Sequence, residues 1–403
     1  MGEHFAYPWD AAERGSGWAA RYDEYKTNQT ITKERKAHVM RGKQIVESIY
    51  RDVQPENNGF WLGNPSEKAK QLYCAYFGIE EEALTEIEKQ NLQNSVLTSE
   101  KIGKADVELA KALNSDLLWF SPEVDPGAWR HPDGKPMWDC FQEKRISLGQ
   151  NGVFAETEDV AEVEAFDWPD PKYLDFTQTM RNIDYAQEAG LAVLGGMWCP
   201  FFHVACDFFG MENYFIKMHT DPDVVLAATE HITEFYLEAN KRCFDAMGNR
   251  LTSAFFGNDL GSQLSLLVSN EFFDKFIAPF MKKLIDQMKS YGLKVTMHSC
   301  GAIFDIIPRL IDLGIDALHP LQAKAANMQP EKLAKEFKND LVLIGGIDTQ
   351  ELLPFGTPQE VKDEVRRLKD IFGSRYIVSP SHEALLENVS IENVVAMSEA
   401  AVE

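Results

Sequence analysis

The chain has 403 residues, of which 44% are hydrophobic and 26% are charged, and its formal net charge is −23. This composition is that of a folded globular protein with enough apolar residues for one large core or two smaller ones. A surface this acidic repels nucleic acids and anionic membranes, so DNA, RNA and lipid are disfavoured as partners. A local basic pocket for a small anion is still compatible with it.

The first residues show no basic segment followed by an apolar one, as a signal peptide would, and Ala6 does not fit the myristoylation pattern. No apolar run reaches the roughly 18 residues that a membrane helix needs. We therefore expect a cytoplasmic protein without a membrane partner. Its six cysteines are expected to be free thiols.

The N-terminal part of the sequence is polar and mostly helical in pattern up to residue 58. An amphipathic helix is predicted over 32–50 and a second helix over 66–78, which ends at a glycine. A buried strand is predicted over 115–123, and a hairpin-like excursion over 124–153. We expect two parts: an N-terminal helical extension over 1–58 and a larger domain over 59–403.

Helices and short apolar strands alternate from about residue 170. The strands are predicted at 191–196, 253–259, 294–299, 315–321, 340–346 and 375–381. The helices are predicted at 172–189, 222–247, 270–292, 302–313, 330–338, 358–372 and 391–402. Such alternation is typical of parallel βα units, and an eighth strand is expected between 55 and 180. No glycine-rich phosphate loop follows a strand, so the sequence predicts an α/β protein with a (β/α)8 TIM-type barrel rather than an open, doubly wound sheet.

The segment "TMHSCGA" places His298 and Cys300 two residues apart at the end of a predicted strand. Side chains at i and i+2 share one face of a strand, and imidazole with thiolate suits Zn²⁺. A third ligand must then come from another strand end. His382 is the best candidate, and Gln322 or Asp259 would supply an oxygen. The alternative is a hydrogen-bonded rim histidine beside an inert, buried thiol.

Other residues near the strand ends have both functional and structural interpretations. Asp348 is predicted either to bind substrate or to form a turn and cap a helix. Three aromatic residues are predicted either to line an apolar substrate pocket or to pack in the core: Trp61, Trp198 and Phe201. The remaining histidines near strand ends are predicted to be structural: His203, His219 and His319.

Four segments of 253–400 carry a resemblance to a known family. They read "NDLGSQ", "KVTMHSCGAIFDIIPRLIDLGIDALHPLQ", "LVLIGGIDTQELLPFGTP" and "SPSHEALLENVSIENVVAM". In this order they resemble the uroporphyrinogen decarboxylase superfamily. The resemblance implies a (β/α)8 fold and one of two chemistries. These are metal-free decarboxylation of uroporphyrinogen and zinc-dependent methyl transfer to or from a corrinoid protein.

The two branches of the superfamily differ in motifs that can be compared with this sequence. The decarboxylases carry an Arg-rich segment similar to P-V-W-x-M-R-Q-A-G-R, whereas "NNGFWLGNPSEK" at that place has no Arg. A substrate with eight carboxylates needs cationic partners, which disfavours the decarboxylase. The methyltransferases bind zinc through His-x-Cys and a distant Cys. His298 and Cys300 match the first two, and His382 in "SPSH" stands where the distant Cys is expected.

The resemblance also implies roles for residues outside the zinc ligands. Asp259 and Gln263 match a strand-end pair and are predicted to be catalytic, with helix capping as the alternative. Gln322 lies near the place of a Glu ligand in cobalamin-independent methionine synthases and is predicted to orient the substrate.

The expected function is zinc-dependent methyl transfer between a corrinoid protein and a small molecule, either a methoxy or methylamine donor or a thiol. The chain lacks the D-x-H-x-x-G cobalamin-binding pattern, so the corrinoid is expected on a partner protein. Two alternatives stay open: a metal-independent decarboxylase and a non-catalytic barrel that binds a small ligand.

Overall fold

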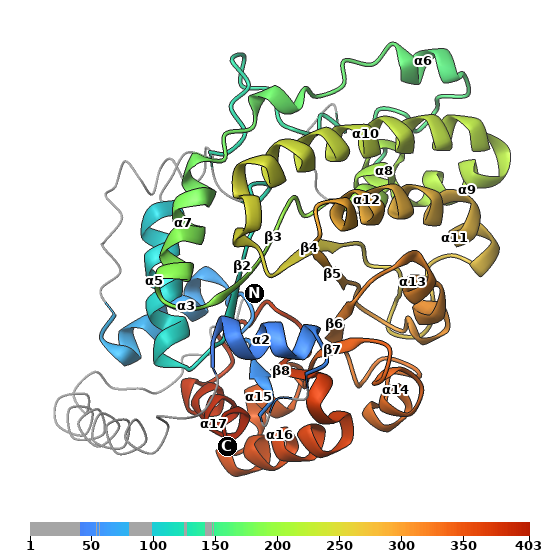
Figure 1. Cartoon of the computed structure of the whole chain (residues 1–403). Helices are drawn as coiled ribbons and strands as arrows, with labels where there is room; N and C mark the ends of the chain where they lie inside the picture. Colours follow the sequence, from blue (N-terminus) through green and yellow to red (C-terminus); the bar gives the residue numbers. More distant parts are fainter. Residues whose placement is uncertain are drawn as a thin grey trace, which may run out of the picture. The chain divides into compact units, whose positions relative to one another are not determined.

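The computed structural model describes residues 41–53, 55, 57–79, 99–124, 127–141, 147 and 149–403. Contacts group Arg41–Glu403 into one compact unit. Within the described residues, eight parallel strands form one sheet in the order β1-β8-β7-β6-β5-β4-β3-β2. The sheet curls into a nearly closed barrel with helices on its outside (Figure 1). The predicted (β/α)8 fold is confirmed.

The strands fall where the alternation predicts them. They are β1 Gly59–Phe60, β2 Leu117–Phe120, β3 Ala192–Gly195, β4 Ser253–Gly257, β5 Lys294–His298, β6 Ala317–Leu321, β7 Val342–Ile347 and β8 Tyr376–Pro380. The eighth strand, expected between 55 and 180, is β1. It has only two residues, too few to show a period-two pattern in the sequence.

The helices mostly follow the expected alternation. They are α2 Lys43–Tyr50, α3 Glu67–Phe77, α5 Ser99–Ala112, α6 Val160–Glu164, α7 Thr177–Glu188, α8 Phe201–Phe209, α9 Met211–Thr220, α10 Pro222–Met247, α11 Asn270–Phe276, α12 Ala278–Ser290, α13 Ile307–Leu313, α14 Pro330–Phe337, α15 Leu352–Phe355, α16 Pro358–Phe372 and α17 Ile391–Ala401. Short 3-10 turns lie at Pro171–Tyr173, Gly248–Arg250, Phe304–Ile306 and Gly373–Arg375. No helix of the described residues has the length and apolar character needed to cross a bilayer.

Two local predictions differ from the described structure. The single helix expected over 270–292 is broken at Ile277, because Pro279 in the first turn of α12 has no N–H and cannot continue α11. The described residues of 124–153 form no strand, so they show no hairpin. An isolated antiparallel bridge ties Trp129 of this excursion to Leu174 instead.

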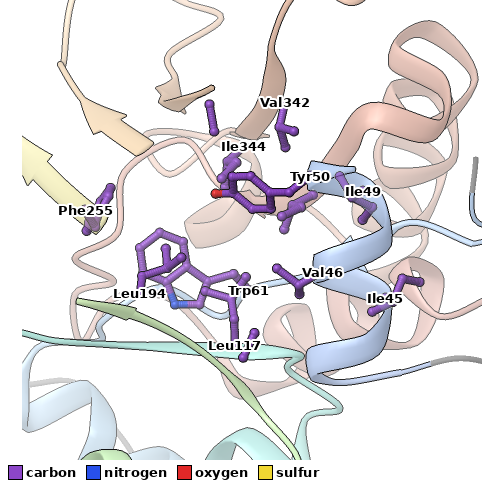
Figure 2. Packing of buried hydrophobic residues seen from close by; sticks show 13 residues of the cluster. Ile45, Val46, Ile49, Tyr50, Trp61, Leu117, Leu194, Phe255, Val342 and Ile344 are labelled. Atoms are coloured by element: carbon purple, nitrogen blue, oxygen red, sulfur yellow. The ribbon is translucent and has the colours of Figure 1, made fainter. Parts of the chain in front are cut away.

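Helix α2 fills the end of the barrel where the strands begin. Its apolar residues share one buried cluster with the inward-facing strand residues, and Figure 2 shows the cluster from close by. The members of the cluster are Ile45, Val46, Ile49, Tyr50, Trp61, Leu117, Ala192, Leu194, Phe255, Ala317, Val342, Ile344 and Ile377. The Tyr50 hydroxyl lies 2.5 Å from Oγ1 of Thr296 on β5. This end is therefore closed. The extension predicted over 1–58 lies largely outside the described residues, and its boundary stays a prediction.

A buried carboxylate joins β1 to β2, which are not neighbours in the ladder. Asp116 accepts hydrogen bonds from the backbone N–H groups of Gly42 (2.6 Å) and Phe60 (2.8 Å) and pairs with Arg41 at 2.6 Å. Its own N–H donates to the Phe60 carbonyl at 2.7 Å. Burial raises the pKa of Asp116 to about 6, although Arg41 and the two N–H donors oppose the shift. Asp116 thus bridges the seam of the barrel, together with the neighbouring Ser115, whose hydroxyl accepts the N–H of Leu62 at 3.2 Å.

Candidate metal and substrate site

His298 is the last residue of β5, and its side chain points into the barrel near the mouth, where the strands end. It is 3% exposed, and its two ring nitrogens face different partners. Nε2 lies 3.3 Å from both Sγ of Cys300 and Oδ1 of Asp259. Nδ1 lies 3.0 Å from Nδ1 of His319 and 3.5 Å from Oε2 of Glu383. The ring therefore connects two groups of potential metal ligands.

The first group consists of Asp259, His298 and Cys300, whose ligand atoms all lie within 4.8 Å of one another. The loops after β4 and β5 bring Asp259 to Cys300, whose N–H donates to Oδ1 of Asp259 at 2.8 Å. The turn requires a glycine at position 301, where φ is +91° and a Cβ would lie 2.3 Å from the Gly261 carbonyl oxygen. The close packing of these loops assembles the group.

The ionisation of this group is strongly coupled. Burial raises the pKa of Asp259, but its hydrogen bond and charge interaction with His298 outweigh this and hold the pKa well below its usual range. Burial lowers the pKa of His298, yet the charge of Glu383 and the hydrogen bonds to Asp259 and Cys300 leave it well above its usual value. Burial also raises the pKa of the Cys300 thiol, against the opposing effect of His298. The acidic groups around His298 thus favour a positive charge at this place, either on the imidazole ring or on a bound cation.

The second group consists of His298, His319 and Glu383, with ligand atoms also within 4.8 Å of one another. Burial holds the pKa of His319 well below its usual value, so its ring is neutral. A neutral His319 can accept a hydrogen bond at Nδ1 from the Nδ1–H of His298, and Nε2 of His298 then faces Cys300 and Asp259. Nε2 donates to them while the ring is protonated and offers its lone pair only when a metal ion displaces that proton. Among the described residues, His319 Nε2 and Glu383 Oε2 have no hydrogen-bond partner.

These residues fit a zinc ion. Imidazole nitrogen, thiolate sulfur and carboxylate oxygen are the donors that Zn²⁺ takes in proteins, and three protein ligands leave one position open for substrate. A metal-binding histidine normally donates its other N–H to an acceptor, which here is His319 or Glu383. The donors on His298 Nε2, Cys300 and Asp259 therefore match a catalytic zinc site in type and number.

His382, predicted as the third ligand, is close to this cluster but lies outside both groups. Its ring centroid lies 6.2 Å from that of His298. Its Nδ1 accepts a hydrogen bond from the N–H of Ala384 at 3.1 Å and lies 3.6 Å from Oε2 of Glu383. The residue that reaches His298 from the end of β8 is thus Glu383, and the role of His382 as a ligand stays a prediction.

The two glutamines predicted at the site lie together. The Oε1 atom of Gln322 accepts hydrogen bonds from Nε2 of Gln263 at 3.2 Å and from the N–H of Gly301 at 2.9 Å. Gln322 therefore ties the loop after β6 to the turn that carries Cys300. Its predicted role in orienting the substrate, and the catalytic role predicted for Gln263, remain untested.

Asp348, at the end of β7, is used locally. Its carboxylate accepts hydrogen bonds from the N–H groups of Gln350, Glu351 and Leu352 at 2.9–3.1 Å, and Lys324 lies 3.4 Å away. Burial raises its pKa, but these backbone hydrogen bonds outweigh burial and lower it overall. The geometry is that of a turn cap, and the substrate-binding role remains a prediction.

Aromatic rings surround His298 on the inner side of the barrel mouth. The ring centroid of Trp198 lies 5.1 Å from that of His298 and 4.9 Å from that of Trp119. Trp119 and Trp198 are partly exposed and cover the buried core cluster. Trp61, by contrast, is fully buried, with its ring centroid 4.8 Å from that of His319.

Phe201, the third aromatic residue predicted to contact substrate, has no exposed surface. It begins α8, and its ring centroid lies 6.5 Å from that of Phe280 on α12. Trp198 is accessible to a ligand in this conformation, whereas Phe201 and Trp61 are not. The substrate-binding roles of all three stay predictions.

Two partners of His298 do not follow from sequence reasoning. His319, for which the sequence predicts a structural role, stands opposite His298 in the pairing of β5 with β6. Glu383 is adjacent to His382 in the sequence. Of the two, His382 is the more obvious ligand by residue type, so the sequence does not single out Glu383. The sequence signal that could have identified His319 is the alternation of β6. Ala317 and His319 occupy its inward-facing positions next to β5.

Residues 141–403 match the family model described as uroporphyrinogen decarboxylase (URO-D). The match covers more than half of the chain and includes β3 to β8 and the whole metal-ligand cluster. The chain belongs to the uroporphyrinogen decarboxylase (URO-D) family.

Curated relatives place the chain nearer one branch of this family. It is 22% identical to the methylcobamide:CoM methyltransferase MtbA of Methanosarcina acetivorans over 181 residues, 45% of this chain and 50% of MtbA. It is 26% identical to the methylated-thiol–coenzyme M methyltransferase of Methanosarcina mazei over 170 residues, 41% of each chain. The chain spans about half the length, or less, of these relatives. They confirm the resemblance to the corrinoid methyltransferase branch.

A solved structure agrees in fold over nearly the whole chain. A methyltransferase from Methanosarcina mazei superimposes with a TM-score of 0.61, covering 89% of this chain and 97% of that one. The two sequences are 15% identical in this comparison, so the likeness establishes the shared barrel fold.

Proposed function

We propose that this protein is a zinc-dependent methyltransferase that moves a methyl group between a small molecule and a corrinoid held by a partner protein. The observation that carries the proposal is the convergence of His298 Nε2, Cys300 Sγ and Asp259 Oδ1 at the mouth of the barrel. Family membership and the methyltransferase relatives support the reaction type.

The proposed zinc ligands are His298 and Cys300 with one further side chain. The distances favour Asp259, because His382 lies outside the group of close ligand atoms. When bound, zinc would supply Lewis-acid chemistry, either polarising the heteroatom that carries the methyl group or stabilising a thiolate. The sequence alone suggests His382 as the third ligand, and substitution of Asp259 and of His382 in turn distinguishes the two ligand sets.

The surrounding residues position these ligands and shape the space beside them. Nδ1 of His298 lies 3.0 Å from His319 and 3.5 Å from Glu383. The opposite nitrogen, Nε2, therefore faces the substrate side. Asp259 accepts a hydrogen bond from the N–H of Cys300, and Gln322 accepts one from the N–H of Gly301. These two hydrogen bonds fix the backbone at Cys300 and so the direction of its thiol. The indoles of Trp119 and Trp198 provide an apolar surface that would exclude water from a bound methyl group.

A corrinoid partner would have to approach the barrel mouth, since helix α2 closes the other end. The loops at the mouth expose large apolar side chains, with Leu264 after β4 82% exposed and Phe355 after β7 77% exposed. Such residues are suited to a protein contact that forms and dissociates in each catalytic cycle.

A metal-independent decarboxylase and a non-catalytic binding barrel have no comparable observation in their favour. The segment after β1, where decarboxylases of this family carry arginines, reads "WLGNPSEK" and contains none. A non-catalytic barrel does not explain why a thiol, an imidazole and a carboxylate should converge without a ligand of their own. Both alternatives predict outcomes that differ from those of the methyltransferase.

The test combines metal content with methyl transfer. Protein purified without chelator is expected to hold roughly one zinc per chain, and His298→Ala is expected to lose it, whereas exposed His219→Ala retains it. Methoxy, methylamine and thioether compounds are then assayed with cob(I)alamin, and thiols with methylcobalamin. Zinc-free wild-type protein or release of CO₂ from uroporphyrinogen would overturn the proposal. Tight binding of these compounds without turnover would indicate the binding barrel.

A further inference from the structure

A half-buried carboxyl group stands behind the Trp198 side of the site and takes no part in the proposed methyl transfer. Glu123 follows β2 and accepts a hydrogen bond at Oε1 from the Tyr236 hydroxyl at 2.6 Å. Its Oε2 accepts one from the N–H of Cys199 at 3.1 Å, and the N–H of Trp198 also contributes. Burial raises the pKa of Glu123 to about 7, although the hydrogen bonds from these donors act in the opposite direction. Burying a carboxyl group is unfavourable in free energy unless hydrogen bonds compensate for the lost hydration, and here the three donors provide them.

The segment that Glu123 holds has an unusual backbone. Cys199 has a φ of +52°, a left-handed conformation that residues other than glycine rarely adopt. Asn240 accepts a hydrogen bond from the N–H of Met197 at 3.0 Å, and Asn258 donates one to the Cys199 carbonyl at 3.1 Å. Polar side chains from three different elements therefore determine where the peptide between Trp198 and Cys199 lies.

The Trp198 indole has little freedom on its other side. A Cβ at position 257 would lie 2.2 Å from Cη2 of Trp198, so the ring lies directly on the Gly257 backbone. Gly257 is the register partner of His298 in the β4–β5 pair. The indole thus fits into a gap beside His298 that exists only because residue 257 has no side chain.

We propose that Glu123 is the positioning residue for the aromatic wall of the methyl-transfer site: its carboxylate fixes the Trp198–Cys199 peptide so that the Trp198 indole stands beside His298 and sets the space for the methyl-bearing substrate. The inference rests on the proposed function for its kinetic consequence but not for its structural one. Glu123 acts through Trp198 and does not contact the reacting atoms.

The test compares substitutions that remove the contact with one that retains it. Glu123→Ala removes both acceptor oxygens, whereas Glu123→Gln retains an oxygen for the Cys199 N–H and an amide that can donate to the Tyr236 oxygen. Tyr236→Phe removes the donor to Glu123 together with the acceptor of the Trp138 indole N–H, and it serves if the alanine variant does not fold. Exposed Glu238→Gln on α10 is the matched control.

Acrylamide quenching of tryptophan fluorescence reports on Trp198 without any activity assay. In Glu123→Ala, Trp198 is expected to be less shielded, so acrylamide should quench the tryptophan fluorescence more strongly than in the wild type. This increase in quenching should be absent when Glu123→Ala is compared with Glu123 in the Trp198→Phe background. Zinc content should stay as in the wild type. Unchanged quenching in Glu123→Ala, or a change that persists in the Trp198→Phe background, would overturn the proposal even if no methyl transfer were ever found.

Kinetics separate positioning from catalysis. With an active donor, Glu123→Ala is expected to raise KM about tenfold with little change in kcat, because the wall of the substrate site is displaced. Glu123→Gln should restore most of the wild-type KM. If the glutamine variant loses kcat as severely as the alanine variant, the charge of Glu123 acts in the reaction and the positioning role is wrong.

Discussion

His298 and His319 face each other across strands β5 and β6 with their Nδ1 atoms 3.0 Å apart. Because burial keeps His319 neutral, its Nδ1 can accept the Nδ1–H of His298, and the other ring nitrogen of His298 then faces Cys300 and Asp259. We predict that His319→Phe weakens zinc binding by roughly 10- to 100-fold, since an outer acceptor fixes the tautomer and orientation of a ligand histidine. Competition with a chromophoric chelator measures this affinity. Equal zinc affinity in His319→Phe and in the surface variant His219→Phe would contradict the assignment.

The third zinc ligand is decided by a pair of substitutions. Asp259 reaches His298 at 3.3 Å, whereas His382 lies outside the close group of ligand atoms. Asp259→Ala is therefore expected to lose zinc, and His382→Ala to retain it at near wild-type stoichiometry. Metal analysis of both proteins, together with Asp259→Cys as a variant that restores a ligand, provides the measurement. Loss of zinc from His382→Ala alone would support the ligand set suggested by the sequence.

The seam of the barrel predicts a large effect on stability. Asp116→Ala removes the partner of Arg41 and the acceptor for two backbone N–H groups at the junction of β1 and β2. Breaking a buried pair in this way should lower the free energy of unfolding by about 3–5 kcal/mol. Urea denaturation followed by circular dichroism tests it. The exposed pair of Lys282 with Asp286 is the control, and its loss should cost under about 1 kcal/mol.

The same carboxyl group predicts a pH dependence. The pKa of Asp116 is raised from 3.8 to about 6, so the native state binds this proton more tightly than the unfolded state does. Its contribution to stability is therefore fully present below about pH 4 and is lost as the pH rises through 6, a change of about 3 kcal/mol. Asp116→Asn should lack this decline when unfolding is compared at pH 4, 5, 6 and 7. Parallel curves for the two proteins would show that the pKa is not raised.

The contact between Gly257 and Trp198 predicts a coupled pair. A methyl group at position 257 would lie 2.2 Å from the indole, so Gly257→Ala should destabilise the protein by about 1–3 kcal/mol and displace Trp198. Trp198→Ala removes the atom that clashes. In a double-mutant cycle the combined variant should be more stable than the two single effects predict. Simple additivity would mean that the ring does not lie against Gly257.

Several features of the fold follow from local sequence patterns. The bounds of α10 and α16 follow from their proline starts and glycine ends, and strands β2 to β8 follow from short apolar runs between helices. Proline at 279 is a visible signal for the break between α11 and α12, although periodicity alone suggests one helix. Strand β1 gives no signal of its own, because its two residues are held by Asp116 and by β8 rather than by a pattern.

The sequence by itself determined that His298 and Cys300 share one face at the end of a strand, since that follows from the two-residue repeat of β-structure. It also determined the succession of strands and helices, and with it the barrel. Only the tertiary structure decided which groups surround His298. His319 depends on the register between β5 and β6, Asp259 on the packing of two loops against Gly301, and Glu383 on the turn after β8. These contacts join residues distant in the chain, so no local pattern encodes them.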